Sequence, residues 1–253
     1  MEAGSNFNSE EIHEDNLISQ MMSHDKHVVF VGDDTWNGLF PNQFHRSYFY
    51  PSLDVADLDT VDRGVFKIVP DEMKKADWSL LIGHMLGVDH CGHTFGPLTD
   101  HIKYKLTEID AFIHSVVKEC DNDTLILAFG DHGMTITGDH GGDSTDETDA
   151  ALFAYSPKGF YEPRNEPRIN QIDITSTIAL LLDVPIPFGS LGTPITELFH
   201  TNTERQEYNI LSKAYHQSIT YLHQYGDSEF VSKFNVSDED VQSTPSLRAY
   251  LER

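Results

Sequence analysis

Five side chains of the kinds that bind divalent metal ions lie in three short clusters between residues 89 and 140. These candidate ligands are Asp89, His93, Asp131, His132 and His140. Carboxylate and imidazole together form a ligand set that suits zinc or a similar divalent ion. Two such ions a few ångströms apart can stabilise both the entering and the leaving oxygen of a phosphoryl group. The residue types therefore predict metal-assisted chemistry of the phosphoryl-transfer kind.

The spacing within the clusters agrees with this prediction. Asp89 and His93 are four residues apart, which places both on one side of a helical turn. Asp131 and His132 are adjacent, so they converge on one ion only where a strand ends and the backbone turns. Gly138, Gly141 and Gly142 allow the tight backbone that would bring His140 back towards them. Each cluster alone is equally compatible with ordinary loop residues, since the chain has 14 histidines. The three together favour a metal site.

Other polar residues near the clusters have alternative explanations. His84 and His90 are close enough along the chain to orient ligands through hydrogen bonds, although His90 is out of phase with Asp89 and His93, which favours a structural role. Cys91 is interpreted as a buried thiol or half of a disulfide with Cys120 rather than as a ligand. Asp139 is expected to shape its loop.

The pattern of apolar residues predicts short buried strands and amphipathic helices. We expect strands near 28–31, 78–83, 124–130 and 151–155, and helices over 100–118, from Asp173 or Thr175 to Leu182, and over 201–224. Region 37–73, with Pro41, Pro51 and Pro70, is expected to be rich in loops. Continuous apolar strands favour a parallel sheet covered on both faces. Two clusters follow such strands, and open α/β sheets place their sites beyond the carboxyl ends of the strands.

Composition and charge argue against partners that are bound through a basic surface. The 253 residues include 41 Asp and Glu against 17 Lys and Arg, a formal charge of -24, which argues against nucleic acid as a partner. No apolar run approaches the ~20 residues that cross a bilayer. Asn122 and Asn235 begin N-glycosylation acceptor sequences, which alone do not fix the compartment.

Longer motifs add a family resemblance. In this order, the clusters resemble those of the alkaline phosphatase superfamily. The resemblance narrows to the glycosylphosphatidylinositol (GPI) ethanolamine phosphate transferases, and within them to the branch that modifies the third mannose of the anchor. The segments that carry it are 32–36, 39–41, 57–62, 84–93, 130–134 and 138–144.

The resemblance implies a fold, a cofactor and a site. It implies a three-layer α/β/α fold with a largely parallel central sheet, in which residues 1–200 form a partial catalytic domain and residues 201–253 a helical segment and polar tail. Asp89, His93 and His140 would hold one Zn²⁺, and Asp131 with His132 would contribute to a second, with Mn²⁺ as an alternative metal. The N-terminal part of the core, with the nucleophilic threonine, would precede Met1.

The resemblance also implies substrates and a compartment. Ethanolamine phosphate would pass from phosphatidylethanolamine to a mannose of the GPI precursor, on the lumenal side of the endoplasmic reticulum membrane. A membrane partner subunit is compatible with this setting. Two other functions remain open: a soluble metal-dependent hydrolase of the phosphodiesterase or sulfatase type, and a zinc-binding remnant without catalytic activity.

Overall fold

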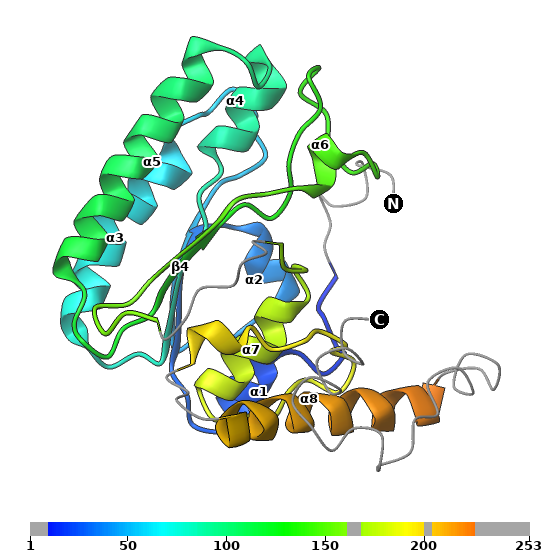
Figure 1. The fold of residues 1–253 in the computed structure, drawn as a ribbon. Helices are drawn as coiled ribbons and strands as arrows, with labels where there is room; N and C mark the ends of the chain where they lie inside the picture. The colour runs from blue at the N-terminus through cyan, green and yellow to red at the C-terminus, as the bar shows by residue number, and fades with distance from the viewer. Residues whose placement is uncertain (1–9, 161–167, 200–203, 226–253) are drawn as a thin grey trace. The chain divides into compact units, whose positions relative to one another are not determined.

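The computed structural model describes residues 10–160, 168–199 and 204–225 (Figure 1). Its elements in chain order are α1 (Leu17–Ser23), β1 (Val28–Asp33), α2 (Thr35–Leu39), β2 (Arg46–Tyr50), α3 (Thr60–Lys75), β3 (Leu80–Gly83), α4 (Gly87–Phe95), α5 (Asp100–Glu119), β4 (Ile126–Phe129), α6 (Thr145–Thr148), β5 (Leu152–Tyr155), α7 (Asp173–Leu181), the 3-10 helix η2 (Thr196–Leu198) and α8 (Glu204–Tyr225).

The chain divides into two units. One comprises Met1–His13 and Asp25–Lys158 and contains all five candidate ligands, and the other comprises Glu14–His24 and Gly159–Arg253. The assignment of residues 1–200 to a catalytic domain and 201–253 to a helical segment and tail remains a prediction. The tail after residue 225 and Asn235 lie outside the described residues.

A parallel sheet of three strands lies at the centre of the first unit. β1 is its middle strand and pairs in parallel with β2 on one edge and β3 on the other. All six residues of β1 are buried, as its apolar sequence requires in a sheet covered on both faces. The α/β class and the parallel sheet predicted from the sequence are confirmed.

Helices cover both faces of β1. On one face Val31 packs against Val65 and Val69 of α3, and Phe112 and Val116 of α5 complete this cluster. α5 runs beside α3 (Figure 1), and its bounds agree closely with the predicted helix over 100–118. On the other face the ring of Phe30 stacks on Trp36 of α2, with 4.7 Å between their centroids.

The strand that precedes Asp131 pairs differently from the expectation of a single sheet. β4 forms an antiparallel pair with β5, with Leu127 opposite Ala154. These two strands make a sheet separate from β2-β1-β3. Among the described residues, no strand joins β3 to β4. β3 and β4 nevertheless end close to the positions that the sequence predicted, so a ligand cluster still follows each of them.

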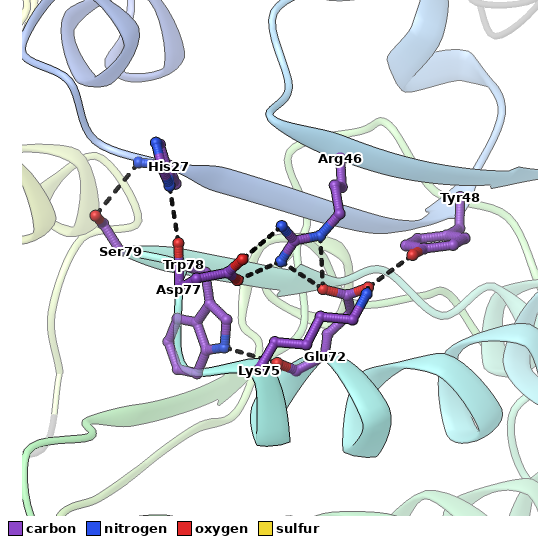
Figure 2. A network of polar contacts seen from close by, with 8 residues as sticks. All are labelled: His27, Arg46, Tyr48, Glu72, Lys75, Asp77, Trp78 and Ser79. Atoms are coloured by element: carbon purple, nitrogen blue, oxygen red, sulfur yellow. Dashed lines mark hydrogen bonds and ion pairs between the residues drawn. The ribbon is translucent and has the colours of Figure 1, made fainter.

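α3 corrects the prediction for residues 37–73. This region is not mainly loop, because Thr60–Lys75 form a helix of 16 residues that contains Pro70. Val61, Val65 and Val69 recur every four residues and are all buried, so the apolar face that they form outweighs the hydrogen bond that proline removes. Near its end, Glu72 joins α3 to Arg46 and Tyr48 of β2 (Figure 2).

The second unit contains helices α1, α7 and α8. α1 begins with a capping box, in which Asn16 accepts a hydrogen bond from the backbone N–H of Ser19 and Ser19 accepts one in return. The predicted helices over 173–182 and 201–224 correspond to α7 and α8. No helix among the residues described is long and apolar enough to cross a membrane.

Candidate metal centre

α4 supplies the first two candidate ligands. It follows β3 after a turn of three residues and presents Asp89 and His93 one helical turn apart. Nε2 of His93 lies 3.5 Å from Oδ1 of Asp89, so the two side chains share a face as their spacing predicted.

His140 completes a compact group with this pair. Its Nε2 lies 3.1 Å from Nε2 of His93 and 3.3 Å from Oδ1 of Asp89. In a tetrahedral zinc site with bonds of about 2.0–2.1 Å, neighbouring ligand atoms lie about 3.3–3.4 Å apart. The three atoms therefore have the mutual spacing of ligands around one small divalent ion, although residues 93 and 140 are far apart in the sequence.

His132 lies against this group. Its ring stacks on that of His140 with 3.9 Å between centroids, and Asp89, His132 and His140 each place a ligand atom within 4.8 Å of the other two. Nδ1 of His132 faces the carbonyl oxygen of Gly133 at 2.8 Å. A carbonyl can only accept, so in the neutral ring Nδ1 carries the proton and Nε2 keeps its lone pair for a ligand.

Asp131 lies at the edge of the group. Its Oδ2 is 3.7 Å from Nε2 of His132, and its side chain is 69% exposed. The structure thus brings Asp89, His93, His132 and His140 together and keeps Asp131 beside them through His132. The division of these residues between two ions remains a prediction.

The environment of the Asp89 carboxylate also indicates that these residues can bind a cation. Oδ1 of Asp89 is buried and accepts no hydrogen bond from any described residue, although two imidazole nitrogens lie within 3.5 Å of it. A buried carboxylate oxygen without a donor is costly. A divalent ion between Asp89, His93 and His140 would remove that cost and satisfy all three groups at once.

The loop that carries His140 is fixed by Glu147 of α6. One carboxylate oxygen of Glu147 accepts the backbone N–H of Gly142 at 2.8 Å, and the other accepts the hydroxyl of Ser144. The Ser144 hydroxyl and the Gly142 N–H lower the pKa of Glu147, which keeps this acceptor ionised. The sequence gave no signal for this role, because Glu147 has no fixed spacing from the ligands. As predicted, Asp139 shapes the loop by accepting the hydroxyl of Thr137.

Gly138 brings the loop directly onto α4. Its φ is +86°, and a Cβ atom there would lie 2.4 Å from the carbonyl oxygen of Gly92. Any other residue would strain the backbone and push the loop away from the helix that carries Asp89 and His93.

Replacing Gly138 with alanine is therefore expected to weaken binding at the predicted zinc site about tenfold, because it moves His140 and adds about 1–2 kcal/mol of backbone strain. Competition with a chromogenic chelator would measure the zinc dissociation constant of the intact protein. Gly159→Ala is the matched control, since Gly159 also has positive φ but has no atom within 4 Å of its Cβ position. Equal zinc affinity in both variants would contradict the role given to Gly138.

His84 and His90 make contacts of their own. Nδ1 of His84 pairs with the carboxylate of Asp33, which also accepts the N–H of Thr35. Burial is the largest single influence and opposes the charge on both partners. The hydrogen bonds and neighbouring charges together outweigh it, so the pKa of Asp33 is lowered and that of His84 is raised. His90 is buried, and its Nδ1 lies 2.9 Å from the carbonyl oxygen of Asp57. Whether either histidine orients a ligand stays a prediction.

The two cysteines are free thiols. Cys91 is fully buried in α4, and this burial raises its pKa, which disfavours the thiolate that binds metal. Of the two alternatives expected for Cys91, the structure shows the buried thiol and not the disulfide with Cys120.

Comparisons with known proteins identify the family of this chain. A sequence model of the type I phosphodiesterase / nucleotide pyrophosphatase family matches residues 11–153. The catalytic subunit of GPI ethanolamine phosphate transferase 3 from Homo sapiens is 44% identical over 246 residues, which cover 96% of this chain and 22% of that protein. GPI ethanolamine phosphate transferase 3 from Saccharomyces cerevisiae is 38% identical over 264 residues, covering 97% of this chain and 26% of that protein.

The chain is also similar to a transferase of type 2. GPI ethanolamine phosphate transferase 2 from Schizosaccharomyces pombe is 36% identical over 252 residues, covering 89% of this chain and 33% of that protein. The chain thus spans between 22% and 33% of the length of these three relatives.

Proposed function

This chain belongs to the type I phosphodiesterase / nucleotide pyrophosphatase family, and on that basis we propose that it is part of an enzyme that transfers ethanolamine phosphate to the GPI anchor precursor. Relatives that carry this activity in their names align with 96% and 97% of the chain.

The observation that carries the proposal is the convergence of ligand atoms from α4 and the 138–142 loop. Asp89, His93 and His140 would hold one divalent ion, and Asp131 with His132 would contribute to a second. Zinc suits this mixture of imidazole and carboxylate better than Mg²⁺ does, and Mn²⁺ is the alternative. When bound, such ions supply positive charge that stabilises oxygen atoms of the reacting phosphoryl group.

The chain's own residues hold and orient this centre. Nδ1 of His132 donates to Gly133, which keeps Nε2 available as a ligand. Glu147 and Gly138 fix the loop of His140. The described contacts of Asp89, His93, His132 and His140 involve no serine or threonine hydroxyl. The nucleophile would then be a threonine outside this group of side chains.

The proposed reaction moves the ethanolamine phosphate group from one alcohol oxygen to another. The bond between phosphorus and the diacylglycerol oxygen of phosphatidylethanolamine breaks, and a bond from phosphorus to a mannose hydroxyl oxygen forms. The hydroxyl proton ends on the released diacylglycerol. We infer from the motif resemblance described above that the acceptor is the third mannose; the human and budding-yeast relatives, both named transferase 3, are compatible with that branch.

The substrates imply a location. Both are membrane lipids, so we propose that the protein acts at the lumenal face of the endoplasmic reticulum membrane, where a membrane partner subunit could join it. Asn122 is exposed in a turn between α5 and β4, which is the setting that N-glycosylation requires. A strongly acidic chain also fits a partner other than nucleic acid.

A transfer assay tests the proposal. The intact protein would be incubated with phosphatidylethanolamine labelled in its ethanolamine group and with a GPI precursor that carries three mannoses. We expect the label to move to the precursor. Label released as free phosphoethanolamine would instead indicate a hydrolase of the phosphodiesterase type, and label that stays in phosphatidylethanolamine would indicate a metal-binding protein without this activity. Either of these results would overturn the proposal.

A further inference from the structure

The helix that carries Asp89 and His93 begins on a carboxylate from another helix. Residue Leu86 at the start of α4 provides no side-chain cap. Instead, Oδ1 of Asp62 in α3 accepts the backbone N–H groups of Leu86 and Gly87, each at 2.9 Å. Asp62 is only 1% exposed. A carboxylate at this position satisfies two N–H groups and interacts favourably with the helix dipole.

The buried charge of Asp62 has a buried partner. Nζ of Lys105 in α5 lies 3.3 Å from Oδ2 of Asp62 and also contacts Asp59 at 2.8 Å and Glu108 at 3.1 Å. The Lys105 side chain is 4% exposed. Burial alone would lower the pKa of this ammonium. Its hydrogen bonds to Asp59 and Glu108 and the charge of Asp62 have a larger opposite effect, so the pKa is raised and Lys105 stays charged.

The start of α4 fits closely onto this ion pair. A Cβ atom on Gly87 would lie 2.2 Å from Oδ2 of Asp62 and 2.5 Å from Cε of Lys105. Only glycine allows the backbone of α4 to approach the pair this closely. The first turn of the helix therefore has one position relative to α3 and α5.

A second attachment lies one turn further along α4. The buried ring of His90 contacts the carbonyl oxygen of Asp57. Asp57 is itself fixed, because its side chain accepts the N–H groups of Asp59 and Thr60 at the start of α3. Residues 57–62, a segment that the sequence resemblance had singled out without a role, thus hold α4 at two points.

We propose that Asp62, with Lys105 as its counter-ion, is a positioning residue that sets the place of Asp89 and His93 in the metal centre. The inference rests on the proposed function, because it assumes that these two residues bind metal. Asp89 lies two residues after Gly87, so loss of the carboxylate that fixes the first turn displaces the Asp89 side chain directly. Displacements of about 0.5 Å are enough to disturb a metal or catalytic constellation.

The test measures zinc binding of variants of the intact protein. Asp62→Ala is expected to raise the zinc dissociation constant about 10–100-fold, the usual effect of removing a group that orients a ligand. Asp62→Asn keeps an oxygen that can accept both N–H groups and should raise it less than about tenfold. Visible spectra of the cobalt-substituted protein would report altered ligand geometry in Asp62→Ala. The thermal midpoint of the same variant is the control. If it is unaltered, the spectral change does not come from loss of the fold.

Two further variants separate positioning from general stability. Lys105→Met leaves Asp62 buried without its counter-ion and should weaken zinc binding, while Asp62→Asn combined with Lys105→Met removes both charges and should restore most of it. Glu108→Gln is the matched control, since it removes a carboxylate partner of Lys105 that forms no hydrogen bond or ion pair with α4 in the part of the chain that the structure describes. It should leave the zinc dissociation constant within about threefold of wild type.

The outcomes distinguish this inference from the proposed function. Asp89→Asn tests the metal centre itself, and unchanged zinc binding in that variant would refute the centre. Weaker binding in Asp89→Asn together with unchanged binding and cobalt spectrum in both Asp62 variants would refute the positioning role alone. If Asp62→Ala does not fold, the comparison of Lys105→Met with the double variant decides the matter, and equal zinc binding in these two would refute the role of Asp62.

Discussion

Replacing His140 with alanine is expected to lower the rate of the proposed ethanolamine phosphate transfer by at least about a thousandfold, which corresponds to about 4 kcal/mol of transition-state stabilisation. His140 contacts three of the other candidate ligands, through its Nε2 contacts with His93 and Asp89 and through its stacking on His132. Its loss would leave Asp89 and His93 without the third ligand and His132 without its packing partner. The transfer assay with labelled phosphatidylethanolamine measures the rate, and elemental analysis of the same preparation measures zinc.

His114→Ala provides the matched control for this experiment. His114 is an exposed histidine in the middle of α5, so its removal tests the loss of an imidazole without the loss of a ligand. Its rate and zinc content should equal those of the wild type. A His140→Ala protein that keeps wild-type zinc and more than about a tenth of the rate would show that the ligand atoms meet for another reason.

The candidate site could be predicted from the sequence because its ligands depend on local patterns. Asp89 and His93 needed only helical spacing, and Asp131 and His132 needed only a strand that ends before them. The contact of His140 with Asp89 and His93 depends instead on tertiary packing, namely the docking of Gly138 on Gly92. Glycine beside a candidate ligand suggests a tight turn but does not say which helix the turn will meet.

The groups that support the ligands could not be predicted from the sequence. Asp62 and Lys105 are 43 positions apart, and their contact exists only because α3, α4 and α5 pack together. No spacing rule links an aspartate in one helix to the first N–H groups of another. Similarly, the sequence identified β4 and β5 as strands but not their antiparallel pairing, because a short apolar strand is compatible with either direction. Pro70 was misleading for the opposite reason, since a strong local signal was overridden by the buried face of α3.

Replacing Glu72 with glutamine is expected to destabilise the first unit by about 3 kcal/mol at pH 7. The Glu72 side chain is 1% exposed and accepts hydrogen bonds from Arg46, Tyr48 and Lys75 (Figure 2). Burial opposes its ionisation, but these three donors outweigh burial and lower its pKa from 4.5 to about 2. Glutamine keeps the shape of the side chain but loses the charge, so Arg46 and Lys75 lose the group that their positive charges face.

The same pKa predicts how this stabilisation depends on pH. A carboxyl group whose pKa is lower in the folded protein stabilises it fully above the unfolded value, and the stabilisation is lost as the pH falls through the folded value. The difference between wild type and Glu72→Gln should therefore be constant above about pH 5 and fall to less than half by pH 3. Hydrogen exchange of the backbone amides in β1 and β2, corrected for intrinsic rates, measures the free energy of opening at each pH.

Asp71→Asn separates a buried ion pair from an exposed one on the same helix. The Asp71 side chain is 70% exposed and lies 3.5 Å from Lys74, so its ion pair is screened by water and should contribute less than about 1 kcal/mol at any pH. A Glu72→Gln protein as stable as Asp71→Asn at pH 7 would contradict the network's role. Because Arg46 also binds Asp77, which lies two residues after the end of α3, part of the network would remain in Glu72→Gln, with Arg46 held by an exposed carboxylate. The loss expected from Glu72→Gln is therefore that of the link between α3 and β2, since the guanidinium would still be paired.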